Sequence, residues 1–77
     1  MEIKDVEKLL RQIRRGENVL ENIKQINLHI SDLRYHAEFG KSLEAGVRKI
    51  LHKDANEIEK NLFFAVEAFI KLDYVRE

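Results

Sequence analysis

The chain has 77 residues, enough for one domain whose single hydrophobic core is only just sufficient. Apolar residues make up 44% of it and charged residues 36%, and 14 basic and 14 acidic side chains cancel, which excludes a disordered charged tail and a strong overall attraction to nucleic acid or anionic lipid. Without cysteine there is no disulfide and no thiolate metal ligand, so packing must stabilise the fold.

No apolar run approaches the roughly 18 residues that span a bilayer, and the first residues lack the basic region and hydrophobic block of a secretory signal. We therefore expect a cytoplasmic protein that does not enter membranes. Proline is absent and Lys, Glu, Arg and Ile are abundant, a composition that suits a helical protein and also suits a thermophile. Residues 1–77 are expected to form a single helical domain.

The first predicted helix covers about residues 3–15. Its apolar side chains recur at helical spacing on one arc: Ile3, Val6, Leu9, Leu10 and Ile13. Gly16, preceded by two arginines, is typical of a helix end, and Asn18 is typical of the start of the next helix. A helix that ran straight through Gly16 would swing its apolar stripe by roughly 140°, so we expect a break there.

The second predicted helix covers about residues 19–38 and has the most regular pattern in the chain. Its apolar residues alternate at spacings of four and three, as in a heptad seam: Val19, Ile23, Ile26, Ile30, Leu33 and Ala37. We predict that the stretch of this seam from Ile23 to Leu33 is the core on which stability depends. Phe39 and Gly40 follow it and predict the end of the helix.

Two further helices are predicted in the second half of the chain. A short third helix, about 43–53, begins after Ser42 as N-cap and turns four apolar residues inward: Leu43, Val47, Ile50 and Leu51. Asp54 and Glu57 form a capping box that predicts the start of a fourth helix, which runs to about Tyr74. The sequence thus predicts an all-α fold, a small bundle of three to four helices completed by oligomerisation.

The last predicted helix carries more apolar surface than one side of a helix can hide. One arc of roughly 120° holds its expected core residues: Ile58, Leu62, Ala65, Val66, Phe69 and Leu72. Phe63, Ile70 and Tyr74, spaced i, i+7, i+11, form a second stripe about 100° away. A second copy of the chain, another protein or a neighbouring helix of the same chain would each cover this stripe, so these three residues are the interface candidates.

A basic stripe runs along the first predicted helix, opposite its apolar arc, and consists of Lys4, Lys8, Arg11 and Arg15. Such a stripe fits a nucleic-acid backbone, because each neutralised phosphate releases counterions. It also fits the solvated outer side of a helix, which we favour because the net charge is zero and no helix-turn-helix spacing or aromatic platform accompanies it.

Three potential metal ligands, His29, Asp32 and His36, lie at i, i+3, i+7 on one side of the second predicted helix. A closed zinc site needs four ligands, and this helix offers no fourth. Partly exposed polar residues are also expected beside a heptad seam, so we predict no metal at these positions.

No glycine-rich phosphate loop, nucleophile elbow, zinc-protease motif or paired catalytic carboxylates occur, so the sequence predicts neither an enzyme nor a cofactor. We interpret the chain as a small protein-interaction or regulatory module, most simply a homodimer. The alternative is a nucleic-acid-binding or transcription-regulating protein that uses the basic faces of the first and third helices. A third interpretation is a subunit or substrate carrier of a larger enzyme.

Overall fold

The described part of the chain consists of three α-helices and contains no strand. The computed structural model describes residues 1–40 and 44–76, with side chains as far as residue 72. α1 covers Ile3–Arg15, α2 covers Val19–Phe39 and α3 covers Ala45–Arg76. The prediction of a small all-α bundle is therefore confirmed, whereas the proposed N-cap Ser42 and the inward-facing Leu43 lie outside the described residues.

The predicted break at Gly16 is confirmed. Gly16 ends α1 in the left-handed conformation, with φ of 79°, and its N–H donates to the carbonyl of Ile13 at 3.0 Å. The N–H of Glu17 donates to the carbonyl of Gln12 at 2.8 Å, so two carbonyls at the end of α1 are satisfied within the turn. Asn18 precedes α2 as predicted, but it makes no capping hydrogen bond with its side chain.

A buried asparagine holds the turn between α1 and α2. The side-chain amide of Asn22 is almost fully buried and donates to Gln12 Oε1 at 3.0 Å and to the Glu17 carbonyl at 3.1 Å. Both donors of the amide are thus satisfied, which a buried polar group requires. Asn22 lies beside the seam of α2, and no feature of the sequence singled it out.

The predicted break between a third and a fourth helix is wrong, because α3 is one continuous helix of 32 residues. Leu51, Ala55, Ile58 and Leu62 follow one another at spacings of four and three, so the apolar stripe keeps its phase through Asp54. Neither glycine nor proline interrupts this stretch, and an exposed aspartate inside a helix costs only a few tenths of a kcal/mol. The capping residues therefore lie on the surface of a helix that does not stop.

All three helices contribute to the core. Its buried apolar side chains are Val6, Leu10 and Ile13 of α1, Ile26 and Ile30 of α2, and Ala55, Leu62 and Ala65 of α3. Partly buried residues surround them: Leu9, Val19, Ile23, Leu33, Ile58, Val66 and Phe69. The predicted seam of α2 and most of the predicted core arc of α3 are confirmed.

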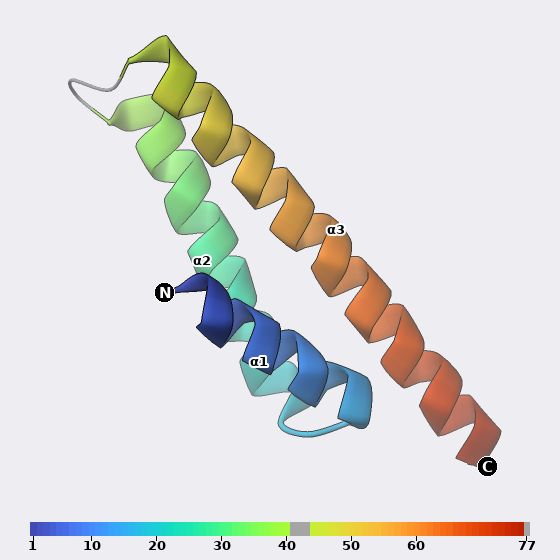
Figure 1. Cartoon of the computed structure of the whole chain (residues 1–77). Helices are drawn as coiled ribbons and strands as arrows, with labels where there is room; N and C mark the ends of the chain where they lie inside the picture. Colours follow the sequence, from blue (N-terminus) through green and yellow to red (C-terminus); the bar gives the residue numbers. More distant parts are fainter. Residues whose placement is uncertain (41–43, 77) are drawn as a thin grey trace.

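The molecule is a rod, with principal extents of 52 × 17 × 16 Å and a radius of gyration of 14.3 Å. A compact chain of this length would have a radius of gyration of about 11.5 Å. α2 and α3 form an antiparallel hairpin, and α1 lies along only the half in which α2 begins (Figure 1). The other half of the hairpin has two helices side by side, and no third helix of the described chain lies against it (Figure 1).

Four residues predicted to face the core are instead exposed: Ile3, Val47, Ile50 and Leu72. Val47 and Ile50 belong to the two-helix half, where α1 does not reach. Leu72 lies beyond Phe69, which packs at the Gly16 turn where α1 ends. Ile3 is the first residue of α1 and is 78% exposed. The helical phase was predicted correctly, but the lengths of the neighbouring helices decide where burial stops.

Candidate interaction surface

Arg34 of α2 reaches an exposed side of α3, at the edge of the contact between the two helices. Its guanidinium donates to Glu59 Oε2 at 3.0 Å and to Asn56 Oδ1 at 3.1 Å, both on α3. The hydrogen bond from Arg34, together with its positive charge, lowers the pKa of Glu59, and the same hydrogen bond raises the pKa of Arg34. Both side chains are exposed, so the pair fixes the register of the two helices more than it stabilises them.

Two apolar residues of α3 continue the same side of the helix. Phe63 follows Glu59 by four residues, and Ile70 follows Phe63 by seven, so both lie on the stripe that begins at the ion pair with α2. Phe63 is 65% exposed and Ile70 is 58% exposed. The side chain of Tyr74, the third predicted interface residue, lies outside the described residues.

α2 adds an apolar residue that the sequence did not single out. Leu20 lies fourteen residues before Arg34 on the same side of α2, and it is 77% exposed. Because α2 and α3 are antiparallel, the register set by Arg34 brings Leu20 to the level of Ile70. Leu20, Phe63 and Ile70 are thus three exposed apolar residues on one side of the hairpin, and we call this set the Phe63 face.

Charged residues border the Phe63 face. Lys71 Nζ and Glu67 Oε1 form an ion pair at 3.1 Å, one turn beyond Phe63 and next to Ile70 along α3. Phe64 packs edge-on against Phe63 with ring centroids 6.1 Å apart, and the ammonium of Lys60 lies 5.9 Å from the centroid of the Phe64 ring. An apolar centre with a polar border is the usual arrangement of a surface that binds another protein.

The predicted basic stripe lies on the outer side of α1. Lys4, Lys8, Arg11 and Arg15 are all exposed, opposite the buried side of the helix. None of them forms an ion pair with any other described residue. They are thus available to water or to an anionic partner, and their geometry is compatible with either.

The three predicted metal ligands separate into a pair and a single residue. His36 Nε2 lies 3.5 Å from Asp32 Oδ1, and both side chains are exposed. His29 instead is one of the residues that line a cleft, together with Leu33. Among the residues with described side chains, no group of three or more His, Cys, Asp or Glu residues is placed to hold a metal ion.

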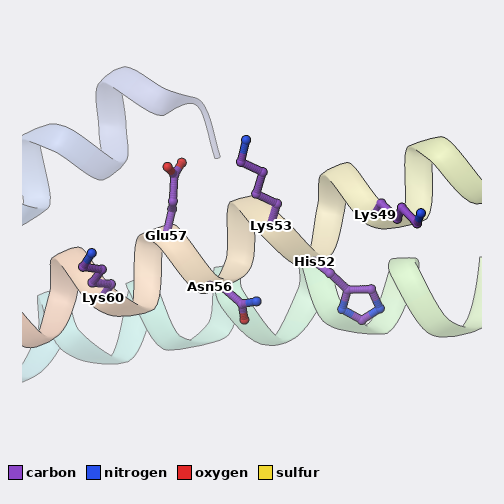
Figure 2. Close-up of a pocket in the computed structure, with 6 residues that line it drawn as sticks. All are labelled: Lys49, His52, Lys53, Asn56, Glu57 and Lys60. Atoms are coloured by element: carbon purple, nitrogen blue, oxygen red, sulfur yellow. The ribbon is translucent and has the colours of Figure 1, made fainter.

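Two of the hollows on the described surface involve α3. One is a shallow depression on α3 alone, where Lys53 and Glu57 project on one side and His52 and Asn56 on the other (Figure 2). Side chains that diverge in this way do not converge on a ligand. The second hollow, of about 410 Å³, lies at the N-terminal end of α1, and all three helices line it. We call it the α1-end cleft.

Two more general observations complete the description. No helix within the described residues is long and apolar enough to cross a lipid bilayer. Comparison of the chain with protein families, with curated proteins and with solved structures found no match.

Proposed function

We propose that the chain is a non-catalytic protein-interaction module that binds a second copy of itself through the Phe63 face. The observation that carries this proposal is the exposure of Phe63 and Ile70, at 65% and 58%, on the side of α3 that α1 does not cover. A monomer with a core this small has little reason to leave such side chains in water.

The spacing of these residues suits a two-fold symmetric pair. Two copies of α3 that cross in antiparallel orientation between Phe63 and Ile70 bring each Phe63 opposite the partner's Ile70. The same contact occurs twice, so the surface is complementary to itself. Leu20, at the level of Ile70, then lies next to the partner's α3.

The expected assembly is weak. Completing the burial of Phe63 and Ile70 in both copies yields roughly 4–8 kcal/mol, from about 1–2 kcal/mol for the exposed part of each side chain. Association costs about 4–15 kcal/mol in lost translational and rotational freedom. Burial of Leu20 adds to the gain, so we expect an equilibrium between monomer and dimer that depends on concentration.

The test is the molar mass in solution, measured by light scattering over a range of concentrations. We expect the Phe63→Glu, Ile70→Glu double variant to be a folded monomer at concentrations where the unmodified chain associates. Leu28→Glu is the matched control, because Leu28 is equally exposed but lies on the side of α2 opposite the seam. An unchanged mass of the double variant with normal helicity would refute the proposal.

Nucleic-acid binding through the basic stripe of α1 is the second candidate function. The observation that favours it is the stripe of four exposed cations, none of them in an ion pair with a described residue. Lys49 and Lys53 at the start of α3 are further exposed cations. Binding that weakens steeply with salt would support this function, because counterion release depends on salt concentration and burial of the Phe63 face does not.

A further inference from the structure

The side of α3 that points away from the core carries a row of lysines next to an exposed aromatic ring. Lys53 lies nine residues before the buried Leu62, which at about 100° per residue is half a turn around the helix from the core. Lys60 lies nine residues before Phe69, which packs on the core, and has the same orientation. Phe64 follows Lys60 by four residues and is 49% exposed. We call the following set the α3 ridge: Lys49, Lys53, Lys60 and Phe64.

The α3 ridge has an excess of positive charge. Its three lysines are exposed and line the shallow depression on α3, and none of them forms an ion pair with another described residue. Glu57 is the carboxylate that lines the same depression. Glu59 and Glu67 are each paired with another cation, and Asp54 lines the α1-end cleft. Three ammonium groups therefore face one unpaired carboxylate, which favours an anionic partner.

Phe64 adds a flat apolar group to this positive surface. Lys60 Nζ lies 5.9 Å from the centroid of the Phe64 ring, so a cation and an exposed ring stand side by side. Proteins that bind single-stranded nucleic acids use this combination, because the ring stacks with a base and the cations hold the phosphates. The basic stripe of α1 lacks it, since α1 contains no aromatic residue.

The shape of the α3 ridge suits an extended ligand. Its side chains diverge around the depression and do not enclose a compact molecule (Figure 2). A strand that lies along the helix needs cations in a row and no pocket. Phe64 lies fifteen residues after Lys49, so the ridge is roughly 22 Å long. A few nucleotides fit this length, near the lower end of the roughly 4–16 nucleotides that small single-strand-binding folds cover.

We propose that the α3 ridge binds single-stranded nucleic acid, with a base stacked on Phe64 and phosphates held by its lysines. This surface is separate from the basic stripe of α1, and it does not rest on self-association through the Phe63 face. Three lysines give an affinity that falls with salt, with a slope of log affinity against log salt of about −2, from about 0.7 for each phosphate neutralised on a single strand.

The probe is a labelled strand of about 12 deoxythymidines, whose binding to the whole chain is measured by fluorescence anisotropy at several salt concentrations. The control probe is an abasic strand of the same length, which keeps the phosphates and removes the bases. Phe64→Leu removes the aromatic ring and Phe64→Tyr keeps it. The variant Lys53→Gln with Lys60→Gln removes two cations of the ridge. Its matched control is Lys8→Gln with Arg11→Gln, which removes two exposed cations of α1.

We expect the deoxythymidine strand to bind more tightly than the abasic strand. Phe64→Leu should weaken binding of the deoxythymidine strand about tenfold, and Phe64→Tyr should retain it, with the helicity of both variants checked by circular dichroism. The lysine variant should reduce the salt slope by about 0.7 for each cation removed, and the α1 variant should leave it unchanged.

Three results would overturn the proposal. The first is the absence of binding at low salt. The second is equal binding of the two strands, which would show attraction to any polyanion. The third is a reduced slope in the α1 variant alone, which would place the nucleic acid on the basic stripe of α1.

The variant Ile70→Gln separates this proposal from self-association. Ile70 belongs to the Phe63 face, so its substitution should reduce the molar mass of the assembly and leave strand binding unchanged. Strand binding with an unchanged molar mass would refute the proposed function and support the α3 ridge. Loss of strand binding in Ile70→Gln would show that a single copy of the ridge is not the site, and would overturn this inference.

Discussion

Gly16 combines a backbone requirement and a space requirement at one position. Its φ of 79° lies in the left-handed region, and a Cβ added there would be 3.2 Å from Cε1 of Phe69. A side chain at this position therefore strains the turn and also displaces an aromatic ring of α3. Both the turn that ends α1 and the packing of Phe69 of α3 require a residue without a Cβ at position 16.

We predict that Gly16→Ala lowers the free energy of unfolding by about 1–2 kcal/mol, measured by urea denaturation followed by circular dichroism. Gly46→Ala is the matched control, because a Cβ there would meet no atom within 4 Å and the residue is helical. It should stabilise the protein by about 0.4–1 kcal/mol, because alanine lowers the conformational entropy of the unfolded chain. Similar destabilisation by both substitutions would contradict this account of Gly16.

The Arg34–Glu59 pair gives a prediction about pH. The pKa of Glu59 is below its ordinary value in the folded protein, chiefly because Arg34 donates a hydrogen bond to it. The ionised Glu59 carboxylate therefore stabilises the folded protein at pH values above its ordinary pKa. This contribution is lost as the pH falls through the lowered pKa of the folded state. We predict that Arg34→Gln raises the pKa of Glu59, measured from its carboxyl resonance by NMR titration. An unchanged midpoint would show that the pair does not persist in solution.

At the scale of the helices, the seam of α2 packs against both other helices. Ile30 is buried, and truncating a buried isoleucine to alanine costs about 2–5 kcal/mol in lost transfer energy and cavity formation. We predict this loss for Ile30→Ala in thermal or urea unfolding, and a change within about 0.5 kcal/mol for Leu28→Ala, since Leu28 is 71% exposed. Equal losses at the two positions would mean that both sides of α2 are covered.

Helix-end signals in the sequence predicted a real helix boundary only where the apolar pattern also changed its phase. At Gly16 the stripe changes direction, and the helix breaks there. At Asp54 the capping box is equally clear, but the stripe keeps its phase and α3 continues. Side-chain capping is worth about 1 kcal/mol, which an unbroken core contact at Ala55 and Ile58 easily exceeds.

The candidate site was predictable only in part. The exposure of Phe63 and Ile70 followed from their spacing on one helix, because a second stripe cannot reach the same core. Leu20 and Ile50 were not predicted to be exposed, since their environment depends on which helix lies beside them and where that helix ends. Sequence spacing fixes the direction of a side chain, whereas the length of a neighbouring helix fixes its burial.

At the scale of the whole molecule, the charged stripe of α1 is expected to matter little for folding. We predict that changing Lys8 and Arg11 to Gln alters the free energy of unfolding by no more than about 0.5 kcal/mol each, because both are exposed and outside the described ion pairs. The same substitutions should leave the molar mass unchanged. If the stripe instead binds duplex DNA or RNA at low salt, the slope of log affinity against log salt should fall by about one for each cation removed.

α3 is one unbroken helix, yet its surroundings change along its length. Around Leu62 and Ala65 it belongs to a three-helix core, and around Val47 it is supported by α2 alone. Opening the helix near Leu62 requires disrupting the whole core, whereas opening it near Val47 requires only separating α3 from the end of α2. Amide hydrogen exchange should therefore be slowest near Leu62 and become progressively faster toward Ala45. Uniformly slow exchange along α3 would contradict this difference in support between its two halves.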